Sequence, residues 1–166
     1  VLHLRCKVSI MKIHLIFVGK TRELYLRDGI EDFLGRLRRY VQVEVKTVRS
    51  ERLTRESQAK RVTAAESEKV AAAIPRDAHF VVLDRQGKQM SSKELAHWWQ
   101  KLEQAGCRKL CFAVGGVLGF SSELRSQAQT LLALSRMTYT HEMSRLILLE
   151  QLYRACTIMR GEKYHK

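Results

Sequence analysis

Short β-rich segments alternate with longer segments of helical period along the whole chain, and this alternation constrains the fold more than any other feature. Several of the short segments are almost continuously apolar, as are strands that are buried on both faces of a sheet. A strand, a helix and a second strand form the repeating unit of a parallel sheet with helices on its faces. The pattern therefore predicts an α/β fold, with a mostly parallel sheet flanked by helices.

The expected elements follow from these periods. Strands are predicted over residues 10–18, 41–48, 79–84, 109–114 and 137–140. Helices are predicted over residues 24–39, 54–73, 93–105, 122–134 and 143–159. Ser91 and Glu94 have the S-x-x-E spacing of a capping box at the start of the third helix. No linker or repeat interrupts the pattern, so we expect a single domain.

The first ten residues lie outside this pattern. Arg5 and Lys7 interrupt any apolar segment of a signal peptide, and no small-residue cleavage site follows, so export is not expected. We expect Met11 to be the natural start, residues 1–10 to be a non-native or disordered extension, and residues 11–166 to form the domain. No apolar run approaches the length of about 20 residues that a bilayer requires. The cysteines form no C-x-x-C pair, and reduced thiols in the cytoplasm are the expectation.

The charge is strongly unbalanced. Thirty lysines and arginines against seventeen acidic residues give a net charge of +13. An excess of this size favours a polyanionic partner, because each cation placed on a phosphate releases counterions. The alternative is a basic, solvated surface without a partner. Residues 49–61 concentrate basic side chains, either as a mobile arm or as the solvated face of a helix.

A glycine-rich segment, residues 114–123, follows one predicted strand and opens a predicted helix. Glycines at such a position let the backbone pass close to a ligand, and the helix start offers free N–H groups. The spacing is neither G-x-G-x-x-G nor G-x-x-x-x-G-K-S/T, which argues against a dinucleotide fold of the usual type and against a P-loop. By spacing alone, a structural turn and a ligand site remain equally open.

The sequence gives little support for a metal site or for a catalytic nucleophile. The histidines have no H-E-x-x-H spacing, and no G-x-S-x-G sequence is present, so we expect no metal. Cys111 lies among apolar residues, as an inert core thiol does, and His79 opens a buried strand.

Residues 143–159 carry apolar side chains on two adjacent stripes, which predicts a helix that is covered on more than one side. The second cover is either the sheet or a partner subunit, and we predict a homodimer. Residues 160–166 follow as either a frayed end or a contact for a base and its phosphates.

Five separated segments, in order, resemble the RlmH family. These are the small knotted methyltransferases of the SPOUT superfamily, which act on a pseudouridine of the large (23S) ribosomal RNA. The resemblance covers residues 11–166 and rests on residues 12–20, 82–88, 114–116, 135–141 and 149–166.

The resemblance implies a deep trefoil knot in the carboxyl-terminal part, with S-adenosylmethionine bound in the knot. Leu83 would line the adenosine pocket, Gly115 would lie at the cofactor, and a loop would wrap it. The loop residues are Leu134, Ser135, Arg136, Met137, Thr138 and Tyr139. The family further implies a homodimer in which the partner chain completes each site, acting on the ribosome in the cytoplasm.

The implied chemistry is attack by the ring N3 of pseudouridine on an activated methyl group. Candidates for positioning or proton transfer are His141, Tyr164 and His165. Candidate contacts to RNA are Arg145, Arg160, Lys163 and Lys166. Two alternatives stay open: a non-enzymatic RNA-binding module, and a methyltransferase of similar fold that acts on transfer RNA.

Overall fold

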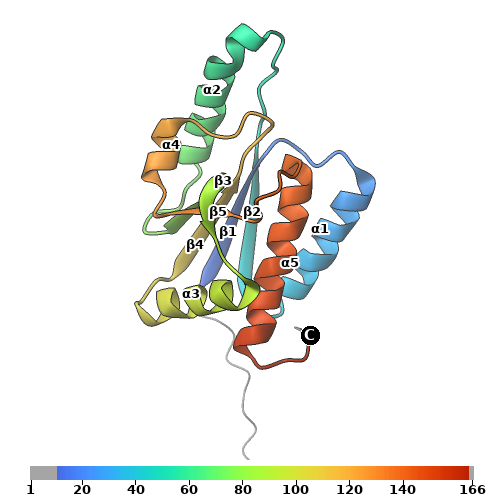
Figure 1. Ribbon diagram of the computed structural model, residues 1–166, viewed down its shortest axis with the longest axis vertical. Coiled ribbons are helices and arrows are strands. Elements are labelled where there is room, and N and C mark those ends of the chain that lie inside the picture. Colours follow the sequence, from blue (N-terminus) through green and yellow to red (C-terminus); the bar gives the residue numbers. More distant parts are fainter. Residues whose placement is uncertain (1–10, 165–166) are drawn as a thin grey trace, which may run out of the picture.

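The computed structural model describes residues 11–164, and it contains a five-stranded sheet in the order β2-β1-β4-β3-β5. Every strand pairing is parallel, so the predicted α/β class and parallel sheet are confirmed (Figure 1). The strands are β1 (Lys12–Val18), β2 (Gln42–Val48), β3 (His79–Gln89), β4 (Lys109–Val114) and β5 (Thr130–Ala133).

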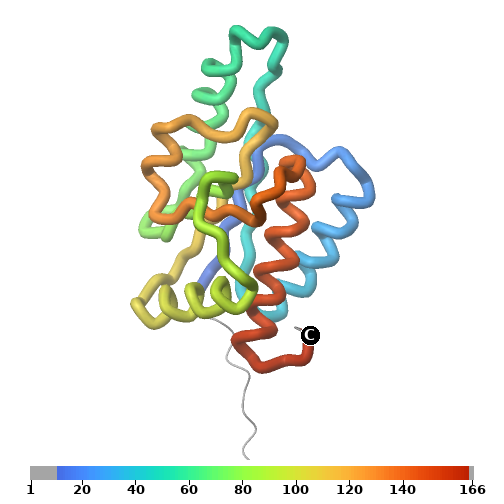
Figure 2. Tube along the Cα trace, viewed as in Figure 1, coloured from blue at the N-terminus to red at the C-terminus, as the bar shows by residue number. Residues whose placement is uncertain are grey.

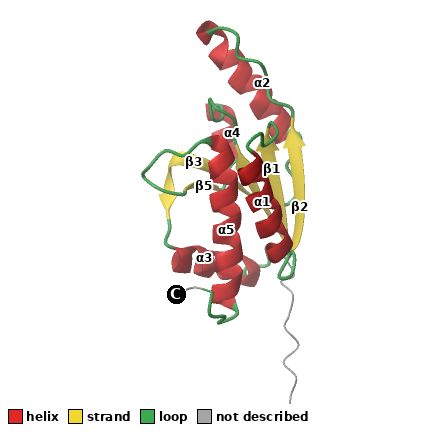
Figure 3. Ribbon diagram, turned by 90° about the vertical axis from the view of Figure 1, so that its right-hand side faces the viewer, coloured by secondary structure: helices red, strands yellow, loops and turns green. Residues whose placement is uncertain are grey.

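Helices cover both faces of the sheet. They are α1 (Leu24–Leu37), the short 3-10 helix η1 (Glu56–Gln58), α2 (Ala59–Ala71), α3 (Ser92–Gln104), α4 (Ser122–Gln127) and α5 (His141–Met159). Alternate residues of β1 enter two separate cores: Ile13 and Leu15 pack with α1, α3 and α5, whereas Ile16 packs with α2 and α4. Figure 3 shows α5 and α1 in front of the sheet and α2 extending beyond its edge.

The predicted start of α3 is confirmed in detail. Ser91 Oγ accepts the Glu94 backbone N–H at 3.2 Å, and Glu94 Oε2 accepts the Ser91 N–H at 2.7 Å. This capping box fixes the position of α3 immediately after β3.

Two predicted elements are wrong. Helix α4 ends at Gln127 rather than at residue 134, and the predicted strand over residues 137–140 is an exposed segment without strand pairing. The last strand is instead β5, whose Leu132 is in register with Leu83 of β3. A short apolar run such as Thr130–Ala133 fits helix and strand patterns equally well, and pairing with β3 decides the outcome.

Strand β3 is longer than predicted, and its pairing with β5 is interrupted by a bulge. Leu83 and Lys88 both align with Leu132, so residues 84–87 bulge out of the pairing. Figure 2 shows this green segment passing the orange segment that contains β5. A Cβ added to Gly87 would lie 2.5 Å from the carbonyl carbon of Leu131, so only glycine fits this crossing. The trefoil knot itself stays a prediction.

The two apolar stripes of α5 are largely covered within the chain. Leu148, Leu149 and Leu152 are fully buried against the core that α1 and α3 share with the sheet. The chain itself therefore covers much of this face, whereas Leu146, Tyr153 and Met159 stay partly exposed, and the predicted homodimer on this face stays a prediction. Among residues 11–164, no helix combines the length and apolar content needed to cross a bilayer. The expected extension over residues 1–10 lies outside the described residues.

Candidate functional site

The carboxyl ends of β4, β3 and β5 bring three predicted cofactor segments to one edge of the sheet. Val82 is in register with Ala113, and Leu83 with Leu132. Gly115 therefore follows β4 close to the level of Leu83 in β3, and Leu134 follows β5 on the other side of β3. Open parallel sheets bind ligands at this edge.

The glycine-rich segment forms a tight turn that is held by its neighbours. The Gly119 N–H donates to the Gly116 carbonyl at 3.2 Å, and Gly119 has a φ of +71°. The Ser121 N–H donates to Ser67 Oγ of α2 at 2.9 Å. A Cβ on Gly115 would lie 3.2 Å from Gly119 Cα, so the turn itself already favours glycine at this position.

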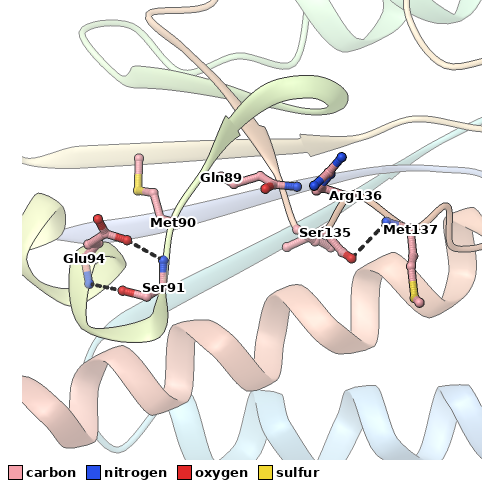
Figure 4. Close-up of a pocket in the computed structure, with 8 residues that line it drawn as sticks. Gln89, Met90, Ser91, Glu94, Ser135, Arg136 and Met137 are labelled. Carbon is pink, nitrogen blue, oxygen red and sulfur yellow. Dashed lines mark hydrogen bonds between the residues drawn. The ribbon is translucent and has the colours of Figure 1, made fainter.

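An open pocket of about 540 Å³ lies beside the predicted cofactor loop (Figure 4). Its lining comes from two segments: the loop supplies Leu134, Ser135, Arg136 and Met137, and the end of β3 with the start of α3 supplies Gln89, Met90, Ser91 and Glu94. Within the loop, Ser135 Oγ accepts the Met137 N–H at 3.0 Å.

Some predicted cofactor residues do not line the pocket, and some residues that line it were not predicted. Leu83, Gly115, Thr138 and Tyr139 do not line it. The four lining residues from positions 89–94 were missed, although the capping box was a usable signal, since it places a helix start there.

His141 lies at the start of α5, directly after the loop. Thr140 caps this helix, with its Oγ1 accepting the Met143 N–H at 3.2 Å. Burial and the nearby Arg145 guanidinium lower the pKa of His141, although Glu142 opposes them. The first turn of a helix also disfavours a cation. His141 is therefore a neutral imidazole near pH 7, the form that can accept a proton.

Arg145 is buried, with 1% of its surface exposed, which corrects its predicted role as an RNA contact. Its guanidinium donates to Thr21 Oγ1 at 2.9 Å and to the Val18 carbonyl at 2.6 Å, and it lies 5.1 Å from the Phe17 ring centroid. These bonds hold α5 against the loop that follows β1. Burial lowers the pKa of Arg145 from its usual range. Its contribution is structural.

The carboxyl-terminal residues fold back onto the far end of α5. The Tyr164 hydroxyl donates to Glu150 Oε1 at 3.2 Å, and its ring lies 4.7 Å from that of Tyr153 and 4.8 Å from the Arg154 guanidinium. Burial and Glu150 raise the pKa of Tyr164, so the phenol stays protonated and serves as an anchor.

Of the other candidate site residues between positions 160 and 166, the structure describes Arg160 and Lys163. Arg160 lies over the Tyr40 ring at 4.4 Å, and Lys163 is exposed. His165 and Lys166 lie outside the described residues.

His141 and Tyr164, the two described candidates for positioning or proton transfer, do not meet within one chain. His141 begins α5, whereas Tyr164 lies beyond its other end. A helix of 19 residues spans about 28 Å at 1.5 Å per residue. A site that uses both ends of α5 therefore needs residues from two chains.

No group of three or more His, Cys, Asp or Glu side chains that could hold a metal ion occurs between residues 11 and 164. The pKa of Cys111 is raised to about 12 by burial, as expected of an inert core thiol.

Comparisons with known proteins match nearly the whole chain. Residues 11–165 match the family model described as a predicted SPOUT methyltransferase. The chain is 43% identical over 155 residues to "Ribosomal RNA large subunit methyltransferase H" of Geobacter metallireducens, covering 93% of this chain and 99% of that protein. The protein of the same name from Symbiobacterium thermophilum is 44% identical over 161 residues, covering 94% of this chain and 100% of that protein.

Several solved structures match this fold. One of them is a probable methylase family protein from Haemophilus influenzae, with a TM-score of 0.53 and 14% identity, covering 96% of this chain and 72% of that one. At this identity the likeness concerns the fold alone.

Proposed function

The chain belongs to the SPOUT methyltransferase family, and from that membership we propose that it is an S-adenosylmethionine-dependent methyltransferase of large-subunit ribosomal RNA. The observation that carries the proposal is the near full-length match to proteins named for that activity, at 43% identity. The net charge of +13 fits a polyanionic substrate.

The pocket beside residues 134–137 suits a nucleoside that carries an amino acid and no phosphates. Met90 and Leu134 offer apolar surface for an adenine, and Arg136 offers a cation for a carboxylate. When bound there, S-adenosylmethionine supplies an electrophilic methyl group. The chain's task is to hold the target nitrogen in line with that group and to accept its proton.

We propose the N3 atom of a pseudouridine as the target. His141 is the proposed proton acceptor, because its lowered pKa favours the neutral imidazole and it begins the helix that follows the loop. Tyr164 is held by Glu150, and we propose that it anchors the tail for contact with the nucleotide. Arg160 and Lys163 are the described candidates for contacts to RNA phosphates, and Lys166 would join them.

A homodimer would complete the site. Four large apolar side chains are exposed near the His141 end of α5: Leu24 and Tyr25 at the start of α1, and Met137 and Tyr139 in the loop. The Glu142 carboxylate accepts the N–H groups of Arg22 and Glu23, so the two helix starts are adjacent. We propose that a second chain covers this surface and brings its tail to the first chain's loop. The place of action would be the cytoplasm, where ribosomes are found.

The decisive experiment is methyl transfer to ribosomes, read by mass mapping of the ribosomal RNA, with isolated transfer RNA as a parallel substrate. We expect methylation of the large-subunit RNA alone. Methylation of transfer RNA alone would favour the second enzyme class. Ribosome binding without cofactor binding or methyl transfer would favour a non-enzymatic RNA-binding module.

A variant pair tests the pocket. Ser135→Tyr should fill it and weaken S-adenosylmethionine binding by at least tenfold in calorimetry. Ser126→Tyr, at an exposed position on α4, is the matched control and should bind normally. Equal affinity in both variants would contradict the cofactor site.

A further inference from the structure

Basic side chains are concentrated on residues 49–61, which we call the basic arm. Five of its residues are basic and all five are exposed: Arg49, Arg52, Arg55, Lys60 and Arg61. It contains two acids, Glu51 and Glu56. Neither the pocket nor the tail uses any of these side chains.

The arm is held in place by α2. The Glu51 N–H donates to Glu66 Oε1 at 2.9 Å, and Lys69 Nζ donates to the Arg49 carbonyl at 3.2 Å. Lys69 also forms a salt bridge with Glu51. Residues 49–55 therefore form a loop that is tied to α2, and the remaining residues begin the helix, as the reading of a solvated helix face predicts for that part.

These contacts leave the arm's cations unneutralised. Lys69 engages the Glu51 carboxylate, which removes one of the arm's two acids as a partner. In the described part of the chain, no salt bridge reaches Arg52, Arg55 or Arg61. Exposed cations that form no salt bridge repel one another, and a polyanion relieves that repulsion.

The arm lies at the same edge of the sheet as the cofactor segments. It follows the carboxyl end of β2, and with α2 it projects beyond the sheet in both views (Figures 1 and 3). Its anchor on α2 also touches the glycine turn: a Cβ on Gly116 would lie 3.1 Å from Glu66 Oε2, and Ser67 accepts the Ser121 N–H. An RNA strand bound along the arm would therefore run toward the edge where the methyl donor is proposed to bind.

We propose that the basic arm binds the phosphate backbone of the ribosomal RNA substrate at a site separate from the target nucleotide. This inference rests on the proposed function and adds a second RNA contact to it. The arm exposes one large apolar side chain, Leu53, whereas a protein partner would need an apolar core to its interface. Arginines on a fixed scaffold suit phosphates, because the guanidinium can donate two hydrogen bonds at once.

The test compares two triple variants. The arm variant is Arg52→Gln with Arg55→Gln and Arg61→Gln. The control variant is Arg38→Gln with Arg39→Gln and Arg108→Gln, which removes three equally exposed arginines near the opposite edge of the sheet. Both lose the same charge, so a general charge effect would weaken them equally.

We expect the arm variant to bind protein-free large-subunit RNA at least tenfold more weakly at 0.1 M salt. The slope of log affinity against log salt should become shallower by about 2 to 3, roughly one for each lost phosphate contact. The control should lose less than about threefold. S-adenosylmethionine affinity and the thermal midpoint should be unchanged in both variants.

Equal losses in the two variants, or no loss in the arm variant, would overturn the proposal while leaving methyl transfer by the wild-type protein intact. A loss of binding to ribosomes without any loss on protein-free RNA would also overturn it, and would assign the arm to a ribosomal protein. Failure of the wild-type protein to methylate or bind ribosomal RNA would instead reject the proposed function.

Discussion

Two buried carboxylates tie distant loops to helices on opposite faces of the sheet, and they differ in charge behaviour. Glu142 in the first turn of α5 accepts the N–H groups of Arg22 and Glu23, at 2.9 and 3.2 Å. Glu66 within α2 accepts the N–H of Glu51 at 2.9 Å. Each of these hydrogen bonds joins two segments that are not adjacent in the sequence.

The pKa values of the two groups shift in opposite directions. Burial raises the pKa of Glu66, and its single backbone donor and Lys69 do not reverse this. Burial also acts on Glu142, yet the two backbone donors, His141 and Arg145 outweigh it, so its pKa is lowered. The start of a helix adds further stabilisation of the anion. Burial acts on both carboxylates, and the second backbone donor and the helix start of Glu142 accompany the opposite direction of its pKa shift.

Replacing Glu142 with alanine should have the largest effect. The substitution leaves two backbone donors without their acceptor and removes the carboxylate near buried Arg145, so we expect a loss of about 3 kcal/mol in the free energy of unfolding. Glu66→Ala should lose only about 1 to 2 kcal/mol. Chemical denaturation at pH 7 measures both losses. Equal losses would contradict the proposed difference between the two carboxylates.

The acid side of the stability curve tests the ionised state of Glu142. Because its folded pKa is lowered, its contribution is complete above the unfolded value of about 4.3 and is lost as pH falls through the folded pKa. Glu142→Gln should therefore flatten the decline in stability below about pH 4. An unchanged slope would show that Glu142 is not ionised preferentially in the folded state.

Variants of Thr140, the cap of α5, distinguish the contribution of the helix cap to stability from that of the Glu142 carboxylate. Thr140→Ala removes the acceptor for the Met143 N–H and should cost about 1 kcal/mol, whereas Thr140→Ser should retain most of the stability. Thermal melts of the pair, in both wild-type and Glu142→Gln backgrounds, would show whether cap and carboxylate act additively. Equal melting temperatures for the alanine and serine variants would exclude the cap.

Glu66→Gln should have the smallest effect and the opposite sign. The folded pKa of Glu66 is raised, so its ionised form costs stability as pH rises from about 4.3 through the folded value. The glutamine keeps an oxygen acceptor for the Glu51 N–H without the charge. We expect the variant to gain up to about 1 kcal/mol over wild type at pH 8, and no gain at pH 4. A variant less stable at pH 8 than at pH 4, relative to wild type, would contradict the raised pKa.

The sequence predicts the sheet better than it predicts the site. Strand β4 agrees with its predicted bounds because its buried run stands between clear boundaries, whereas β5 is too short to reveal its period without β3 beside it. Arg145 was predicted to contact RNA because of its charge. The sequence does not reveal its hydrogen bond to the Val18 carbonyl, which lies 127 residues earlier in the chain. The pocket residues from position 89 onward could not be predicted, because their placement depends on the length of β3. That length is set by the pairing of Lys88 and Gln89 with β5.

The bulge of β3 beside β5 also has a consequence for local unfolding. Leu83 and Lys88 meet the same residue of β5, and the Gly87 backbone lies against the Leu131–Leu132 peptide, with no room for a side chain. Residues 84–88 thus lie directly against β5, and we expect them to move when β5 separates from β3. Amide hydrogen exchange in β5 should therefore follow the opening of that segment, and the pocket that begins at Gln89 should lose its wall in the same event.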